Sequence, residues 1–234
     1  MAAAHGWFIL GTMTSARTDS GPNAEPWEPG FHADLEDRLA TRLDPISALQ
    51  SWEHQPSHLY TIEAVLTPEA PSTSAAVLMP IVRRPEGWTL LLTQRTATMP
   101  THAGQVAFPG GRRQAEDQTP IDAALREAFE ETGIPQNLPR VIGGLPQFLT
   151  GTNFMITPVA AFLEPGFPLA PDPREVDEVF ETPLSFLFNP ANHERRSAVF
   201  QGVERSFYAM PYGRHYIWGV TAAIIRGLYE RLYL

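Results

Sequence analysis

The chain has 234 residues, of which 43% are hydrophobic and 18% charged, so it can bury one substantial core and does not require two compact domains. Its formal net charge of −9 argues against a nucleic-acid backbone or an anionic membrane as partner, because either would favour a basic protein surface. The absence of cysteine excludes disulfides, thiolate catalysis and cysteine–zinc sites, and we expect a cytoplasmic protein.

Residues 1–33 are largely Pro, Gly, Ser, Thr and Ala without periodicity, which predicts a mobile N-terminal extension. Its apolar patch, Trp7 to Leu10, is too short for a membrane span and lacks the basic segment of a secretory signal. We expect residues 34–234 to form a single domain.

After Asp34, three leucines four residues apart predict a short helix with one apolar stripe: Leu35, Leu39 and Leu43. This stripe packs on the domain or, in a homodimer, on a partner chain. Residues 74–84 and 87–95 then predict two strands around a turn at Pro85 to Gly87.

Two glycines, Gly110 and Gly111, follow Phe108 and Pro109. Glycine lets a ligand or a metal approach the backbone closely. An ordinary tight turn is an equally good explanation of the pair taken alone. The glutamates that come shortly after the pair, at positions 127–131, favour the first interpretation.

A helix is predicted over about residues 120–132, with Thr119 as N-cap, Pro120 in its first turn and Gly133 as its stop. One face is apolar and is expected to pack against the domain: Ile121, Leu125, Ala128 and Phe129.

The opposite face carries Glu127, Glu130 and Glu131, whose spacing places their Cβ atoms roughly 5 to 6 Å apart. Only Arg126 is close enough in sequence to offset them, and it can reach Glu130 and orient that carboxylate. A solvated surface run is the alternative, but the preceding glycines favour a metal site. Oxygen ligands without His or Cys select Mg²⁺ or Mn²⁺, and such ions accept phosphate oxygens of a substrate.

Beyond the acidic helix, residues 141–149 and 156–163 predict another pair of strands. Residues 175–184 predict a strand, or a helix leading into one, near the site. A helix over 220–232 has a core-packing stripe of Ile224, Ile225, Leu228 and Leu232. Together these elements predict an α/β class, with a mixed sheet between helices.

Other residues carry weaker signals. His102, His193 and His215 lack the spacing of metal ligands, so structural or substrate-contacting roles are the better interpretation. Four aromatic residues could stack an adenine or belong to the core, and both options stay open: Tyr208, Tyr212, Tyr216 and Trp218. No P-loop or Gly-x-Ser-x-Gly elbow is present.

The glycines and the acidic helix together resemble the Nudix box, over about residues 111–134. The box pattern is Gly, five residues, Glu, seven residues, then Arg-Glu-aliphatic-x-Glu-Glu-x-Gly-aliphatic. Its second half matches at Arg126, Glu127, Ala128, Glu130, Glu131, Gly133 and Ile134. The first half is one residue longer than the pattern, so its Glu position falls on Asp117 or Gln118.

The segment Leu91 to Gly111 further resembles the signature of the coenzyme A pyrophosphatase branch of this superfamily. The matching residues are Leu91, Leu92, Thr93, Arg95, Gly104 and Phe108 to Gly111. Pro100 stands where that branch carries a second Arg, which makes coenzyme A specificity less secure than superfamily membership. Residues 175–184 and 215–228 also look like this branch.

The resemblance implies a Nudix-type α/β/α sandwich and hydrolysis of coenzyme A, or its derivatives, to 3′,5′-ADP and 4′-phosphopantetheine with Mg²⁺ or Mn²⁺. It implies Glu127, Glu130 and Arg126 as catalytic residues. The implied metal ligands are Glu127, Glu131, Glu130 and the Gly111 carbonyl. The implied substrate-binding residues are Arg95, Gly104, Phe108 and Gly110, while Glu175 or Glu178 would add a late carboxylate.

Two other functions are compatible with the sequence. The same carboxylates would serve hydrolysis of ADP-ribose, NADH or another nucleoside diphosphate derivative, an option that Pro100 favours. A catalytically inert nucleotide-binding module ranks low, because such a module is expected to lose box glutamates and all three are present. The general base cannot be assigned, since Nudix members draw it from different places.

Overall fold

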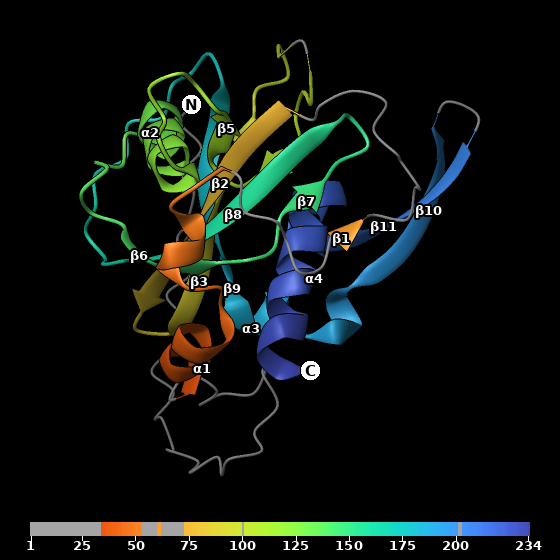
Figure 1. Cartoon of the computed structure of the whole chain (residues 1–234). Coiled ribbons are helices and arrows are strands. Elements are labelled where there is room, and N and C mark those ends of the chain that lie inside the picture. Colours follow the sequence, from red (N-terminus) through yellow and green to blue (C-terminus); the bar gives the residue numbers. More distant parts are fainter. Residues whose placement is uncertain (1–33, 53–59, 62–72, 100, 201–202) are drawn as a thin grey trace, which may run out of the picture.

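The computed structural model describes residues 34–52, 60–61, 73–99, 101–200 and 203–234 (Figure 1). The predicted N-terminal extension and Pro100 lie outside these residues. The helices are α1 (Leu35–Arg42), α2 (Pro120–Thr132), α3 (Leu184–Leu187) and α4 (Gly219–Tyr233), with short 3-10 turns η2 (Ile46–Leu49) and η3 (Pro190–Asn192).

A mixed sheet forms the centre of the fold, and within the described residues it has nine strands. They are β1 (Tyr60–Thr61), β2 (Thr73–Arg84), β3 (Gly87–Arg95), β4 (Val106–Ala107), β5 (Gly110–Arg112), β6 (Arg140–Gly144), β7 (Phe148–Leu149), β8 (Phe154–Leu163) and β9 (Val176–Pro183). The mixed α/β prediction is confirmed.

Strand β2 organises this sheet. It runs parallel to β8 along one edge, from Thr73 to Val82. Its other edge is shared by two antiparallel strands, β5 beside residues 75–77 and β3 beside residues 81–84. This sharing places the glycine strand β5 beside β2, its one hydrogen-bonded neighbour among the described strands, and under helix α2, which contacts both β2 and β5.

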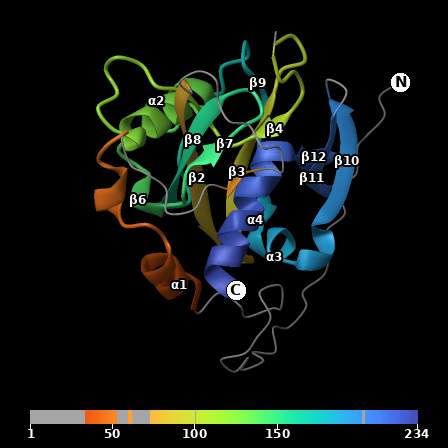
Figure 2. The ribbon, with the colours of Figure 1, turned by 45° about the vertical axis from the view of Figure 1, so that its right-hand side comes forward.

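Alternating side chains of β2 supply the two faces of the sheet. Ala76 and Leu78 pack with the alanines of α2. Met79 and Ile81 pack in the largest core cluster with residues of α4. The sheet therefore lies between helices, with α2 on one face and α4 on the other (Figures 1 and 2).

Helix α1 packs on this domain as the leucine stripe predicts. Leu35 and Leu39 are fully buried, and Arg38 donates a 3.2 Å hydrogen bond to the carbonyl of Leu232 in α4. No helix in the described part of the chain is both long and apolar enough to cross a membrane.

A second sheet of three antiparallel strands lies beside α4: β10 (Glu194–Phe200), β11 (Val203–Tyr212) and β12 (His215–Trp218) (Figure 2). The sequence pattern predicts no strand at β10 or β11. Met210 and Ile217 attach this sheet to the main core, in which both are fully buried. Tyr208 and Tyr212 pack against the same core, whereas Tyr216 is 41% exposed.

Candidate active site

Helix α2 begins and ends at the predicted residues. The Thr119 hydroxyl accepts a hydrogen bond from the Asp122 backbone N–H at 3.2 Å, and the Asp122 carboxylate accepts one from the Thr119 backbone N–H at 2.8 Å. This reciprocal capping box fixes the first turn. Gly133, at φ 75°, ends the helix in the left-handed conformation that glycine adopts without strain.

Three of the four predicted packing residues of α2 do pack: Ala128 is buried, and Ile121 and Leu125 are partly buried against the same cluster. Phe129 is 48% exposed, so its expected packing role is wrong. The buried stripe instead follows Ala124, Ala128 and Glu131, at helical spacings of four and three residues. Small alanines let the helix lie close to the sheet. The same close approach carries Glu131 into the protein, with only 3% of this residue exposed.

Glu127 lies directly over Gly111 of strand β5. A Cβ added to Gly111 would lie 2.4 Å from the Glu127 Cδ atom and at most 2.6 Å from both carboxylate oxygens. Glycine at this position is therefore a steric requirement of the carboxylate above it. Burial raises the pKa of Glu127 despite the opposing effect of Arg126.

Glu131 reaches the neighbouring glycine. Its Oε2 atom accepts a 3.2 Å hydrogen bond from the backbone N–H of Gly110, and its Oε1 atom lies 3.3 Å from the Arg95 guanidinium. Burial nevertheless raises the pKa of Glu131 to about 8, because these two partners offset only part of the cost of removing a carboxylate from water. Arg95 is thus a compensating cation for Glu131, although the two residues are far apart in the sequence.

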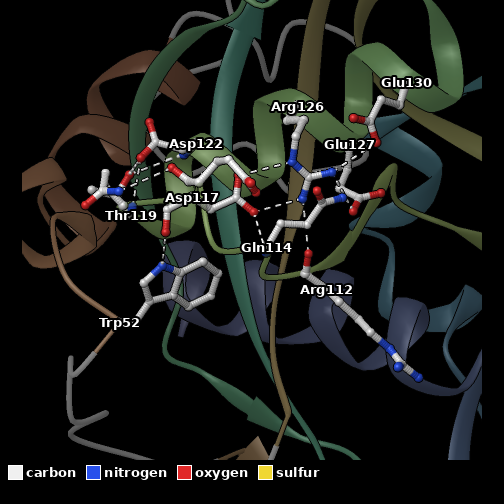
Figure 3. A network of polar contacts seen from close by, with 11 residues as sticks. Trp52, Arg112, Gln114, Asp117, Thr119, Asp122, Arg126, Glu127 and Glu130 are labelled. Carbon is white, nitrogen blue, oxygen red and sulfur yellow. Dashed lines mark hydrogen bonds and ion pairs between the residues drawn. The ribbon is translucent and has the colours of Figure 1, made fainter.

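Arg126 forms the centre of a polar network (Figure 3). It contacts both Glu127, at 2.9 Å, and Glu130, at 3.0 Å, which confirms the predicted reach to Glu130. It also donates a 3.1 Å hydrogen bond to the carbonyl of Arg112 at the end of β5. Arg126 therefore orients two box carboxylates and ties the helix to the glycine strand.

The residue that completes this network is Asp117. Its two oxygens accept hydrogen bonds from Arg126 Nε at 3.1 Å and from a terminal guanidinium nitrogen at 2.8 Å. Arg126 and burial act in opposite directions on Asp117, and the hydrogen bond from Arg126 holds its pKa below the ordinary value. Gln118 is exposed and bonds only to the Glu116 carbonyl among described residues. Asp117 thus occupies the ambiguous first position of the box.

Glu175 and Glu178, the two carboxylates that follow the box in the sequence, have different surroundings. Glu175 lies 3.8 Å from Arg95, and its charge helps to raise the pKa of both Glu127 and Glu131. Glu178 instead bonds to His215 at 2.9 Å and to Arg214 at 2.6 Å. Glu175 therefore belongs to the carboxylate site, whereas Glu178 joins β9 to β12.

A short loop holds Glu175 against α2. The backbone N–H of Asp172 donates to the carbonyl of Glu131 at 3.1 Å, and that of Ala170 donates to the carbonyl of Thr132 at 2.8 Å. The Asp172 carbonyl then accepts a 3.0 Å hydrogen bond from the Glu175 N–H. These bonds place a sequence-distant carboxylate beside the box without a sequence motif of its own.

The remaining predicted residues lie around this centre. Gly104 is exposed, and its carbonyl accepts a 3.4 Å hydrogen bond from Gln94. Phe108 is 3% exposed and packs in the main core, so its side chain supports the site from behind rather than lining its surface. His193 bonds to the Leu187 carbonyl and to Arg226, a structural arrangement away from the box.

The donor set fits a hard divalent ion. Glu127 and Glu131 present oxygen atoms beside Gly111 and Gly110, and burial raises the pKa of each, so that a bound cation would favour their charged forms. Among the described residues, no three acidic or histidine side chains stand close enough to hold an ion alone. Mg²⁺ is commonly bound by one or two carboxylates, with water and substrate phosphate completing its coordination.

Comparisons with known proteins show which family the chain resembles. The NUDIX domain family matches residues 72–201. An uncharacterized Nudix hydrolase, NudL, from Photorhabdus laumondii is 41% identical over 158 residues, covering 68% of this chain and 84% of that relative. NudL of Escherichia coli K12 is 43% identical over 154 residues, covering 66% and 80% respectively. A Nudix hydrolase structure from M. smegmatis, RenU, is 29% identical with a TM-score of 0.41, covering 47% of this chain and 70% of that one.

The chain belongs to the Nudix hydrolase superfamily. This membership agrees with the mixed α/β fold and with the box predicted at residues 111–134. The members of this superfamily typically use divalent metals and act on nucleoside diphosphate-linked substrates.

Proposed function

We propose that this protein is a metal-dependent diphosphatase that hydrolyses coenzyme A and its derivatives to 3′,5′-ADP and 4′-phosphopantetheine, or its acyl form. The observation that carries the proposal is the Arg95–Glu131 contact of 3.3 Å. Arg95 belongs to the segment that resembles the coenzyme A branch, and Glu131 belongs to the box. The branch-like segment is thus part of the carboxylate site itself.

The expected ligands are Glu127, Glu131 and the Gly111 carbonyl, and Glu130 would join them after release from Arg126. Bound there, Mg²⁺ or Mn²⁺ would neutralise diphosphate charge and lower the pKa of a coordinated water. Glu175 is our candidate for the carboxylate that accepts a proton from the attacking water. In the proposed hydrolysis, the water oxygen bonds to one phosphorus atom of the diphosphate. The bond from that phosphorus to the bridging oxygen breaks, and the bridging oxygen leaves with the other phosphate.

Arg126 would act through position rather than by proton transfer. Its contacts with Asp117, Glu127 and Glu130 raise its own pKa, so it stays charged throughout. A fixed guanidinium keeps Glu127 over Gly111 before substrate arrives. Such preorganisation lowers the cost of reaching the transition state.

The proposal is tested by product analysis with coenzyme A, Mg²⁺ or Mn²⁺, and a chelator control. Glu127→Gln is expected to keep the fold and to lower kcat by at least about 100-fold. Glu116→Gln is the matched control, since Glu116 is an exposed loop residue outside the network. Unchanged turnover in Glu127→Gln would reject the assigned site.

ADP-ribose, NADH and related diphosphates form the second candidate substrate class. Pro100 favours this class, because the coenzyme A branch carries an arginine at that position. Glu127 and Glu131 would serve both classes equally. Only a direct comparison of substrates separates them.

A further inference from the structure

The chain contains no lysine, so all 17 of its basic residues are arginines. Two of them near the box are already paired with acids. Arg95 contacts Glu131 and Glu175, and Arg126 contacts Asp117 and two box glutamates. A substrate that carries a phosphate group besides its diphosphate is held most strongly by another cation close to the site, and in a chain without lysine an arginine best supplies a permanent one.

Arg112 meets this requirement. It directly follows Gly111, is exposed, and forms no ion pair with any described carboxylate. Two contacts fix its position: its carbonyl accepts the hydrogen bond from Arg126, and its guanidinium lies 4.9 Å from the centre of the Phe154 ring. An oriented guanidinium loses little freedom on binding, and its planar fork matches a phosphate group.

The strand geometry sets where such a phosphate would lie. Gly111 faces Glu127 on the α2 side, so the next residue of β5 points to the opposite face of the sheet. Figure 3 shows the Arg112 side chain extending away from Glu127 and Glu130. Neighbouring strand residues are separated by about 3.3 Å along the strand. A group bound to Arg112 would therefore lie near the diphosphate but across the strand from it.

We propose that Arg112 binds a phosphate monoester on the nucleotide part of the substrate, such as a ribose 3′-phosphate, and thereby selects substrates that carry one. This inference rests on the proposed function and deepens it. Arg112 would be a specificity-determining residue, distinct from the residues that surround the scissile bond.

The chain supplies a matched control in Arg113. It is also exposed and forms no ion pair with a described carboxylate, although its charge contributes the smallest share of the lowered pKa of Asp117. Its guanidinium lies 5.2 Å from the centre of the Trp52 ring. The Trp52 indole bonds to the Asp117 carbonyl at 3.1 Å, on the α2 side of the sheet. Arg112→Gln and Arg113→Gln therefore remove the same charge from opposite faces of the sheet at the end of β5.

The test compares kcat/KM for coenzyme A and 3′-dephospho-coenzyme A in the wild type and both variants. Arg112→Gln is expected to lower kcat/KM for coenzyme A by about 10- to 100-fold, through KM, since a charge-assisted hydrogen bond is lost. The same substitution should change kcat/KM for 3′-dephospho-coenzyme A by no more than about twofold, because no such bond is removed there. Arg113→Gln should leave both substrates unchanged.

Calorimetric binding of 3′,5′-ADP and 5′-AMP gives a second readout without turnover. Arg112→Gln should weaken 3′,5′-ADP binding and leave 5′-AMP binding unchanged. If Arg112→Gln lowers kcat/KM equally for coenzyme A and 3′-dephospho-coenzyme A, or does not lower it for coenzyme A, the inference is overturned. If the wild type hydrolyses both coenzymes equally well, Arg112 selectivity fails while the proposed function stands; if it hydrolyses neither, the proposed function fails.

Discussion

The carboxylate of Glu127 occupies the space that a side chain on Gly111 would need, with its Cδ atom 2.4 Å from the position of an added Cβ. Helix α2 and strand β5 are therefore in contact through the Glu127 carboxylate and the backbone of Gly111. This close approach places the carboxylate against the backbone of Gly111, whose carbonyl we propose as a second ligand of the same ion.

Gly111→Ala tests this relationship. The added methyl must displace Glu127, and a displacement of about 1 Å can cost on the order of 100-fold in rate. We expect a loss of kcat and of Mn²⁺ affinity, measured by steady-state kinetics and titration. Gly213→Ala is the control, because its Cβ would meet nothing within 4 Å, so any effect there comes from the positive φ of 58° and not from contact with a carboxylate. Comparable activity losses in both variants would contradict the prediction.

Glu131 predicts a pH dependence of stability. Burial raises its pKa from 4.5 to about 8, so the folded protein holds this proton more tightly than the unfolded chain. The metal-free protein should therefore lose stability as pH rises from about 4.5 through about 8. Glu131→Gln should unfold at a higher temperature than the wild type at pH 8 in chelator, with a smaller difference at pH 5.

Bound metal should reverse the order of the two unfolding temperatures at pH 8. Mn²⁺ is expected to raise the unfolding temperature of the wild type at pH 8 and to leave Glu131→Gln nearly unchanged, since binding to the folded state stabilises it. Equal Mn²⁺ stabilisation of both proteins would exclude Glu131 as a ligand.

The contact between Asp117 and Arg126 is expected to stabilise the fold. Asp117→Asn breaks the paired contact with Arg126 and should lower the free energy of unfolding by about 2 to 3 kcal/mol near neutral pH. Because Arg126 lowers the pKa of Asp117, its stabilisation is present above the ordinary carboxyl pKa and is lost as pH falls through the depressed value. Denaturant unfolding of the variant and of Gln118→Asn, the control, checks this; a larger effect of the control would reassign the box position.

The two late glutamates give a matched pair of variants. Glu175→Gln should lower kcat by about 100-fold, in the range of a lost general base, and change its pH profile. Glu178→Gln should change stability more than kcat, because Glu178 joins β9 to His215 and Arg214. The reverse ranking of the two kcat values would move the late carboxylate to Glu178.

Most of the site could be predicted from local sequence, and its exceptions have physical causes. Thr119 and Gly133 mark the helix ends because capping depends on nearby residues alone. Phe129 misleads because periodicity gives weight to large apolar residues, whereas this helix packs through alanines. Glu131 lies on the buried stripe, and burial of a carboxylate is a departure from pattern that occurs at functional sites.

Contacts distant in sequence could not be predicted in the same way. Arg95 reaches Glu131 across 36 residues, and Asp172 positions Glu175 through backbone bonds that carry no residue pattern. Strand β10 lacks apolar alternation because residues 195–199 are all exposed. Its pairing with β11 gives it a structure that its own sequence does not indicate.

The most direct measurement compares kcat/KM for coenzyme A, ADP-ribose and NADH, each with Mg²⁺, Mn²⁺ or chelator, with products separated by chromatography. Our account predicts metal-dependent turnover with a clear preference for coenzyme A, and 3′,5′-ADP and 4′-phosphopantetheine as products. Preference for ADP-ribose or NADH would contradict the coenzyme A assignment, and turnover that persists in chelator would contradict the metal site.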